Sequence, residues 1–462
     1  MKYPTALLFT LLFFANAISA QTSTLKGYIG TALENNIALQ QKNLSYQRSL
    51  QALKEAKGLF FPKVTFNARY SMAQGGRTID FPVGDLMNPV YENLNLINDL
   101  ASDANPSYPN IPAYPALDNI ATNFLRPREQ ETTIRAAMPL FNASIIQNQR
   151  IQENLSETER IGVEVYKREL VKEVKTAYFN YAKAVQAVSL FENTMELVNE
   201  NLRTSESLYR NHKVTIDEVY TAQAQIKAVE QDLANAQKNE KIAQSYFNFL
   251  LNEEFETAIA LEVNRVDPLA VSKQESLVET AQMNREEIQQ MNHYLAVTDS
   301  KIKLNKGNML PAVNLALDYG VQGRDYNLDS DSDFVMGSVV MSWNLFDRSN
   351  KPKVQQARIE KEELNRQKLE IQRKIGLQTI SALHELEASG KQIELAEAQV
   401  KALDQAYKLV NKKYTLGQAN QVELTNARTQ MTNAQQQLII ARYDFQIRQA
   451  ELERATGTYN FN

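Results

Sequence analysis

The chain of 462 residues contains no cysteine, so it has no disulfides, thiolate metal sites, cysteine nucleophile or lipidated lipoprotein cysteine. Its three histidines (His212, His293 and His384) are far apart in sequence and form no metal-binding motif. Motifs for serine hydrolysis or phosphate binding are also missing. The net charge is −4, and no basic stripe indicates a nucleic-acid partner. These absences predict a protein without enzymatic activity or a cofactor.

Glycine and proline are also scarce, at 15 and 13 residues. Most of the prolines fall in one stretch, so the rest of the chain lacks the usual interruptions of secondary structure. Alanine, glutamine, glutamate, lysine and leucine are abundant instead, as in long helices. The composition therefore predicts a mainly helical protein.

Residues 1–20 have the pattern of a secretory signal peptide. Lys2 precedes an apolar stretch, and Ala17–Ala20 provides small residues for cleavage. The apolar stretch, Ala6–Ala15, covers about ten residues, too few for the roughly 20 that a membrane-spanning helix needs. We expect the mature protein to leave the cytoplasm.

The remaining sequence is an internal duplication, with repeats at 21–268 and 269–462. Gly58 and Pro62 recur as Gly307 and Pro311, an offset of 249 (307 − 58 and 311 − 62). Further along, the offset is 205, as for Tyr209 and Tyr414 (414 − 209). A longer insertion between the strands of the first repeat explains the change. Each repeat therefore reads as helix, two strands, and long helices.

The long helices are expected at about 143–252 and 353–457, each interrupted by a short polar turn. The stretch Ala143–Arg210 alone would extend about 100 Å at 1.5 Å per residue. Such helices must pack along their length, and apolar or small residues recur at alternating steps of three and four from Leu386 to Tyr414. This spacing predicts a coiled-coil seam.

The strands are expected at about 62–72, 131–140, 312–322 and 334–345. Strands of this length, apolar on one face and polar on the other, are typical of a transmembrane barrel with a wet lumen; a soluble sheet covered by helices is the alternative. Four strands cannot close a barrel, and open edges are not tolerated in hydrocarbon, so several chains must share one. The candidate lumen-facing residues are Lys63, Asn67, Arg69, Arg135, Asn314 and Asp318.

The connection between the first two strands, about 73–131, contains seven of the prolines, from Pro82 to Pro127. We expect a long, irregular loop at the outer end of the barrel.

Several segments together resemble the TolC family of outer-membrane efflux proteins over essentially the whole mature chain. They are Ala32–Asn36, the strand entries at Gly58 and Gly307, Leu140-Phe141, Leu345-Phe346, Tyr414-x-x-Gly417 and Val422-Glu423-Leu424. The resemblance implies a homotrimer in which each protomer adds four strands to a shared outer-membrane β-barrel. It also implies a long α-helical barrel in the periplasm of a Gram-negative cell. The implied partners are outer-membrane lipid, a periplasmic adaptor (membrane fusion protein) and an inner-membrane transporter.

In that family the turns after the long helices form the periplasmic tip, which here corresponds to 209–219 and 414–424. The residues of interest are Tyr209, His212, Asp217, Glu218, Tyr414, Gly417, Glu423 and Asn426. His212 stands where the second repeat has Gly417, a residue suited to positive φ. The carboxylates could form a lumenal ring that attracts cations. Equally, they could favour the helix macrodipole.

The expected function is therefore a passive outer-membrane conduit of a tripartite efflux system. A type I protein-secretion channel is the alternative. A coiled-coil surface protein would explain the signal peptide and the seam but not the duplicated strands. A periplasmic adaptor would contain less helix than this chain.

Overall fold

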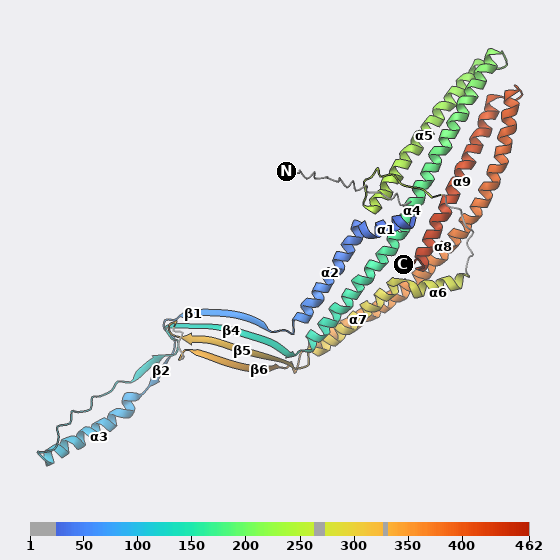
Figure 1. Ribbon diagram of the computed structural model, residues 1–462. Helices are drawn as coiled ribbons and strands as arrows, with labels where there is room; N and C mark the ends of the chain where they lie inside the picture. Colours follow the sequence, from blue (N-terminus) through green and yellow to red (C-terminus); the bar gives the residue numbers. More distant parts are fainter. Residues whose placement is uncertain (1–24, 263–272, 327–330, 462) are drawn as a thin grey trace, which may run out of the picture. The chain divides into compact units, whose positions relative to one another are not determined.

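The computed structural model describes residues 25–262, 273–326 and 331–461, whose helices and strands are labelled in Figure 1. The signal peptide predicted at 1–20 and the predicted repeat boundary at 268 lie outside these residues. Among the described helices, none is both long enough and apolar enough to cross a membrane.

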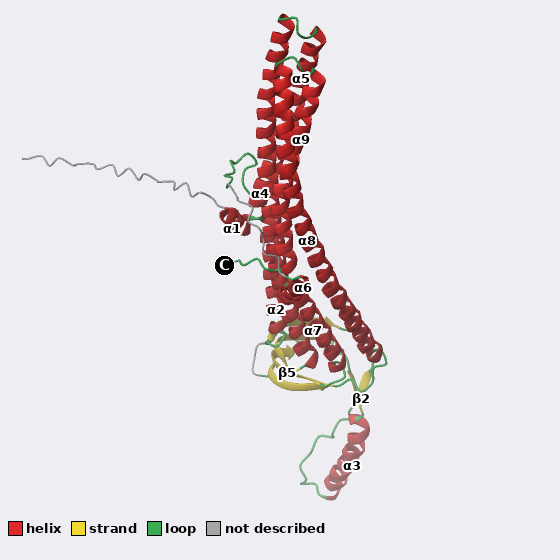
Figure 2. Ribbon diagram, turned by 90° about the vertical axis from the view of Figure 1, so that its right-hand side faces the viewer, coloured by secondary structure: helices red, strands yellow, loops and turns green. Residues whose placement is uncertain are grey.

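Four long helices lie side by side as two hairpins (Figure 2). The first consists of α4 (Ala143–Arg210) and α5 (Ile216–Leu251), and the second of α8 (Asn350–Thr415) and α9 (Gln421–Thr456). The positions of the predicted seam on α8 are all buried or half-buried, from Leu386 at 2% exposure to Tyr414 at 0%. The three-four spacing had therefore identified the packed face of this helix.

Four shorter helices differ from the expectation. The predicted stretches before the strands are each broken once, giving α1 (Leu25–Asn35) and α2 (Ile37–Gly58), and α6 (Gln274–Asn284) and α7 (Glu286–Gly307). Asn36 and Arg285 occupy the breaks, and they are repeat mates (36 + 249 = 285). Both side chains are buried.

The two breaks make equivalent contacts. Asn36 Nδ2 donates to the carbonyl oxygen of Leu250 over 2.9 Å, and Arg285 Nη1 donates to that of Ala455 over 3.2 Å. Leu250 and Ala455 are themselves repeat mates (250 + 205 = 455). Each broken helix is thus held by a side chain that satisfies a carbonyl near the end of the last helix in its own repeat. This equivalence supports the duplication.

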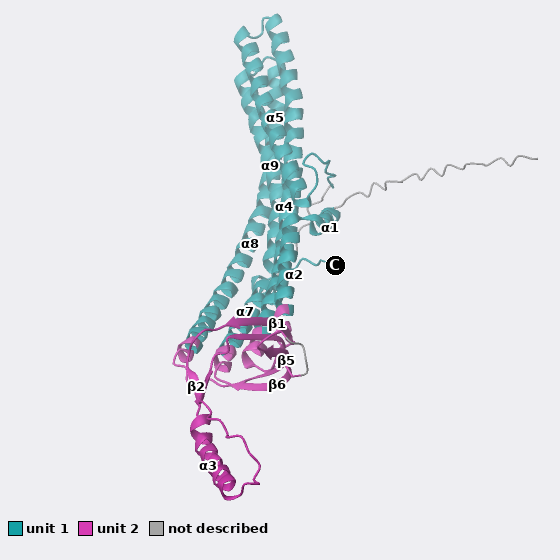
Figure 3. Ribbon diagram, turned by 90° about the vertical axis from the view of Figure 1, so that its left-hand side faces the viewer, with its two compact units in different colours: residues 1–54, 149–302, 354–462 teal, residues 55–148, 303–353 magenta. Residues whose placement is uncertain are grey.

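The described residues form two compact units (Figure 3). One consists of the described residues within 1–54, 149–302 and 354–462, and the other of those within 55–148 and 303–353. Each unit draws on both sequence repeats, so the compact units do not coincide with the repeats. The core of the helical unit includes Tyr28, Tyr178 and Phe247, with the rings of Tyr28 and Phe247 edge to face at 5.1 Å.

The second unit contains an antiparallel sheet of four strands in the order β1-β4-β5-β6 (Figure 1). The strands are β1 (Lys63–Met72), β4 (Arg128–Phe141), β5 (Ala312–Gly323) and β6 (Asp333–Ser342). β4 begins before the predicted residue 131 because Arg128 pairs with Met72 at the end of β1. β6 ends before the predicted residue 345 because Ser342 pairs with Ala312, the first residue of β5. Beyond it, Trp343 Nε1 donates to the Met309 carbonyl oxygen over 2.9 Å.

The prediction of an irregular loop at 73–131 was wrong. The segment contains β2 (Thr78–Phe81), paired with β3 (Ile120–Asn123), and the helix α3 (Val83–Ala104) between them. Pro82 precedes the helix, Pro89 lies inside it, and the later prolines follow it. Proline density concealed an apolar periodicity at helical spacing, carried by Leu86, Val90, Leu94, Ile97 and Leu100.

Asparagines on α3 hold the chain that returns beside it. The Asn88 side chain exchanges hydrogen bonds of 3.0 and 2.7 Å with the backbone of Leu117, and Asn95 does so with Tyr114 at 3.0 and 2.8 Å. Gly84 lies so close to Leu117 that a Cβ atom would be 2.3 Å from its carbonyl oxygen. The returning segment is therefore ordered by side chains that replace strand pairing.

Each of the four long helices is followed at its C-terminal end by a residue with a left-handed backbone conformation. His212 (φ 56°) and Asn252 (φ 58°) are the repeat mates of Gly417 (φ 70°) and Gly457 (φ 66°). At the hairpin tips the paired backbone hydrogen bonds also match: Lys213 to Leu208 and His212 to Tyr209, and Gln418 to Lys413 and Gly417 to Tyr414. These are Schellman motifs, which satisfy the last carbonyls of the helix. His212 therefore differs from Gly417 in its side chain but has the same left-handed backbone conformation.

Replacing His212 with glycine is expected to stabilise the first tip by about 0.5–1 kcal/mol, because an L side chain in the left-handed region is strained. Hydrogen exchange of the Lys213 amide should slow accordingly. The matched change Gly417→Ala should accelerate exchange of the Gln418 amide. Equal exchange in all variants would contradict the strain.

Candidate functional site

The two hairpin tips are joined through the buried side chain of Tyr414, at the end of α8. Its hydroxyl lies 2.7 Å from Ser205 Oγ on α4 and donates to Glu218 Oε2 on α5 over 3.3 Å. Tyr414 is 0% exposed. Burial raises the pKa of the Glu218 carboxyl, the Tyr414 hydrogen bond opposes that shift, and the charge of Asp217 adds to it. One phenol from the second repeat thus connects both helices of the first hairpin.

The other predicted tip residues are exposed: Tyr209, His212, Asp217, Gly417, Glu423 and Asn426. The backbone N–H of Glu423 donates to the cap residue Asn420, and the Asn426 side chain accepts from Gln430. Asp217, Glu218 and Glu423 all lie in the first turns of α5 and α9. Their positions suit both the macrodipole and the lumenal-ring interpretations, which stay predictions.

The sequence did not point to Ser205 or to the contact between Arg428 and Gln225. Arg428 is 6% exposed, and its Nη2 donates to Gln225 Oε1 over 2.7 Å, joining α9 to α5. Burial lowers the pKa of this guanidinium. Ser205 left no signal in the duplication, because its repeat mate is Val410 (205 + 205 = 410).

The strand register places the six predicted lumen residues on one face of the sheet. Arg135 on β4 lies opposite Asp318 on β5, and the two form a bidentate ion pair at 2.6 and 3.0 Å. On the same face, Arg69 of β1 pairs with Glu131 of β4 at 2.8 Å. Lys63, Asn67 and Asn314 are exposed there.

The opposite face is apolar and exposed. It carries Val64, Phe66, Ile134, Leu317, Tyr319, Val335 and Val339, each exposed by 48–71%. An apolar patch of this size needs a hydrophobic partner. The sheet therefore separates a charged face from an apolar one.

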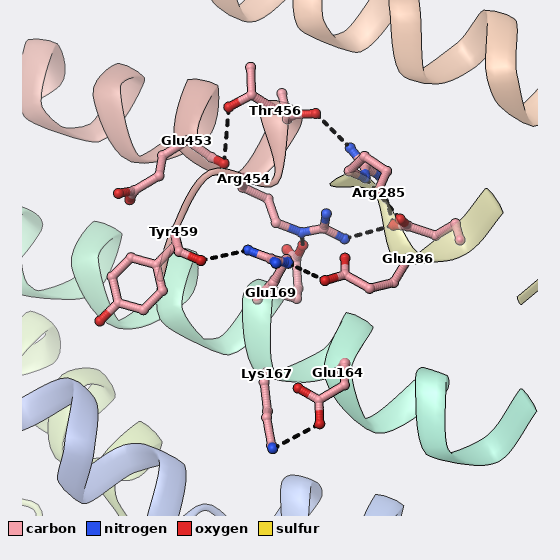
Figure 4. Close-up of polar contacts among 12 residues, drawn as sticks. Glu164, Lys167, Glu169, Arg285, Glu286, Glu453, Arg454, Thr456 and Tyr459 are labelled. Atoms are coloured by element: carbon pink, nitrogen blue, oxygen red, sulfur yellow. Dashed lines mark hydrogen bonds and ion pairs between the residues drawn. The ribbon is translucent and has the colours of Figure 1, made fainter. Parts of the chain in front are cut away.

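A network of ion pairs links three helices of the helical unit (Figure 4). Arg454 of α9 contacts Glu287 of α7 at 2.9 Å and Glu169 of α4 at 3.1 Å. Arg285 also contacts Glu287, at 2.7 Å. Burial alone would raise the pKa of the Glu287 carboxyl, but hydrogen bonds and charges from Arg285 and Arg454 lower it to about 2. The network fastens the first repeat to the second.

Glu287 gives the helical unit an acid-sensitive contact. Its pKa falls from 4.5 to about 2 on folding. The stabilisation is therefore present above pH 4.5 and is lost as the pH falls toward 2. A Glu287→Gln variant should lose stability at pH 7 and show a weaker decline between pH 4.5 and 2, measured by urea unfolding. Parallel profiles for both proteins would contradict the assignment.

Comparison with known proteins agrees with this geometry. Residues 277–458 match the outer membrane efflux protein family. Outer membrane protein TolC of Escherichia coli (strain K12) is 21% identical over 352 residues, covering 73% of this chain and 71% of TolC. The fold also resembles the CmeC outer membrane channel of Campylobacter jejuni, with a TM-score of 0.75, 14% identity and coverage of 94% and 85% of the two chains. The open-state MtrE outer membrane channel of Neisseria gonorrhoeae gives a TM-score of 0.71, 16% identity and coverage of 94% and 88%.

The chain shares the fold of solved outer-membrane channels, and its match to the outer membrane efflux protein family supports the same class of protein. Over residues 277–458 the chain is similar to the outer membrane efflux proteins, and it is similar to TolC over most of its length. The similar proteins are channels rather than enzymes.

Proposed function

We propose that three copies of this chain form one continuous outer-membrane channel, a passive exit duct for substrates that an inner-membrane transporter delivers through a periplasmic adaptor. The observation that carries this proposal is the open four-stranded sheet. Its order leaves β1 and β6 as outer strands, and its apolar face is exposed. In hydrocarbon each outer strand needs a partner for its backbone groups, and another copy supplies one.

The same arrangement explains how the duct works without chemistry of its own. The apolar face would meet lipid, while Lys63, Asn67, Arg69, Arg135, Asn314 and Asp318 would line a wet lumen. The tips joined through Tyr414 would restrict the periplasmic entrance. The three-copy stoichiometry and the partners follow from the resemblance to the TolC family.

The test begins with the full mature chain purified from outer membranes in detergent. Light scattering should give the mass of three chains, and planar bilayers containing the protein should conduct ions. Recovery of the chain in the periplasmic fraction without detergent would overturn the proposal, as would a monomer that does not conduct. Identification of the adaptor that co-purifies would distinguish drug efflux from type I protein secretion.

Reversing one charge tests the lumenal ring. Glu423→Lys is expected to shift the reversal potential of single channels in a salt gradient away from cation selectivity, because a focused field depends on the sign of its source. Glu423→Gln should give an intermediate shift. An unchanged reversal potential in both variants would place Glu423 outside the conduction path.

A further inference from the structure

The two tips use equivalent tyrosines unequally. Tyr414 is buried and bonded to Ser205 and Glu218. Its repeat mate Tyr209 (209 + 205 = 414) is 42% exposed, and its hydroxyl has no hydrogen-bond partner among the described residues. A tyrosine at an exposed tip carries a large apolar ring and a polar hydroxyl that favour an interface. The first tip is therefore incomplete within one chain.

The backbone positions both tyrosines alike. His212 and Gly417 follow them at the same spacing, in the same left-handed conformation, and the same pair of backbone hydrogen bonds closes each turn. The helices that continue from the turns, α5 and α9, are each 36 residues long. Tyr209 is thus placed on its hairpin as Tyr414 is on the second.

The groups that would receive Tyr209 follow from the duplication. Tyr414 meets Ser205 and Glu218 of the hairpin before it, and the repeat mates of these residues are Val410 and Glu423 (205 + 205 and 218 + 205). Glu423 is exposed, and its carboxylate has no bonded partner within the described part of the chain. Val410 offers an apolar surface where Ser205 offers a hydroxyl. Glu423 is the matching acceptor.

We propose that the Tyr209 hydroxyl of one copy donates a hydrogen bond to the Glu423 carboxylate of the adjacent copy. This contact rests on the proposed oligomer, in which the second hairpin of one chain lies beside the first hairpin of the next. Around the tip ring, two kinds of hydrogen bond would then follow one another: Tyr414 to Glu218 within a chain, and Tyr209 to Glu423 between chains.

The absence of cysteine from the natural chain makes the contact directly testable. Tyr209→Cys and Glu423→Cys are placed on separate, differently tagged copies of the full chain, which are co-expressed and treated with a short bis-maleimide. A covalent dimer carrying both tags is expected. In the control, Leu197→Cys replaces Tyr209→Cys; Leu197 is exposed on the same helix, about 18 Å before Tyr209 (12 residues at 1.5 Å). This pair should give no such product.

The mass of the assembly, measured before cross-linking, separates the two proposals. A trimer without the two-tag product would overturn the Tyr209–Glu423 contact but not the proposed channel. A chain that remains monomeric overturns both.

The hydrogen bond itself is tested with Tyr209→Phe, which removes only the hydroxyl. Trimers of this variant should dissociate at a lower temperature, as seen by gel electrophoresis of samples heated to a series of temperatures. Their channels should also have a higher conductance. Combining Tyr209→Phe with Glu423→Gln should add less than the sum of the single changes. Trimer stability equal to that of the natural chain, or strict additivity, would overturn the bond.

Discussion

Replacing Arg454 with methionine should lower the free energy of unfolding by about 1.5–3 kcal/mol, because it removes charge-assisted hydrogen bonds to two carboxylates in a largely buried site. Arg285 still contacts one of these carboxylates, Glu287. The Arg454 side chain is only 12% exposed and contacts both Glu287 and Glu169. Methionine preserves most of the apolar volume of the arginine stem, so the loss reports the charge. Urea unfolding of the detergent-solubilised protein, followed by helical circular dichroism, measures it.

Arg448 on the same helix is the matched control. It contacts Glu385 and Glu451, but its side chain is 39% exposed. Arg448→Met should therefore cost less than about 1 kcal/mol. Equal destabilisation by the two arginine substitutions would show that burial of the network is unimportant.

In the proposed channel, removing the Tyr414 hydroxyl, in Tyr414→Phe, should favour opening of the tips. The ring stays in place, while Ser205 and the half-buried Glu218 lose their link to the second hairpin. A hydrogen bond to a charged group contributes about 1.5–3 kcal/mol, so the open population should rise roughly tenfold or more. Single-channel recordings should show larger conductance or longer open times.

Tyr220→Phe serves as the control for this measurement. Tyr220 also lies near the tip but is 63% exposed, with no hydrogen bond in the described part of the structure. Its loss should leave conductance unchanged. If Tyr414→Phe behaved like Tyr220→Phe, the tyrosine link would not hold the tip closed.

Periodicity made much of this fold predictable. The step of three and four from Leu386 to Tyr414 identified the packed face of α8, and the alternation in β1 and β5 separated the two faces of the sheet. Both patterns are local and depend on burial of one face. The positions of Gly58 and Gly307 likewise marked helix ends, where α2 and α7 stop.

The features that could not be predicted from the sequence either have no local sequence pattern or have a misleading one. Prolines concealed α3, and single residues, Asn36 and Arg285, broke helices without glycine or proline. Ser205 could not be recognised because the other repeat has Val410. The contact of Arg454 with Glu169 joins residues 285 positions apart, so only the tertiary structure brings them together.

The internal join between β4 and β5 links the last strand of one repeat to the first strand of the next. In the proposed assembly, β6 and the β1 of a neighbouring copy repeat that relationship. The two joins would then have similar geometry, but only the join between copies would depend on protein concentration. The internal join forms at the fixed effective concentration set by one polypeptide, whereas the other must be found by collision. Dilution therefore weakens only the second kind of join. Every chain enters the proposed trimer with its four strands already paired, as one third of the ring.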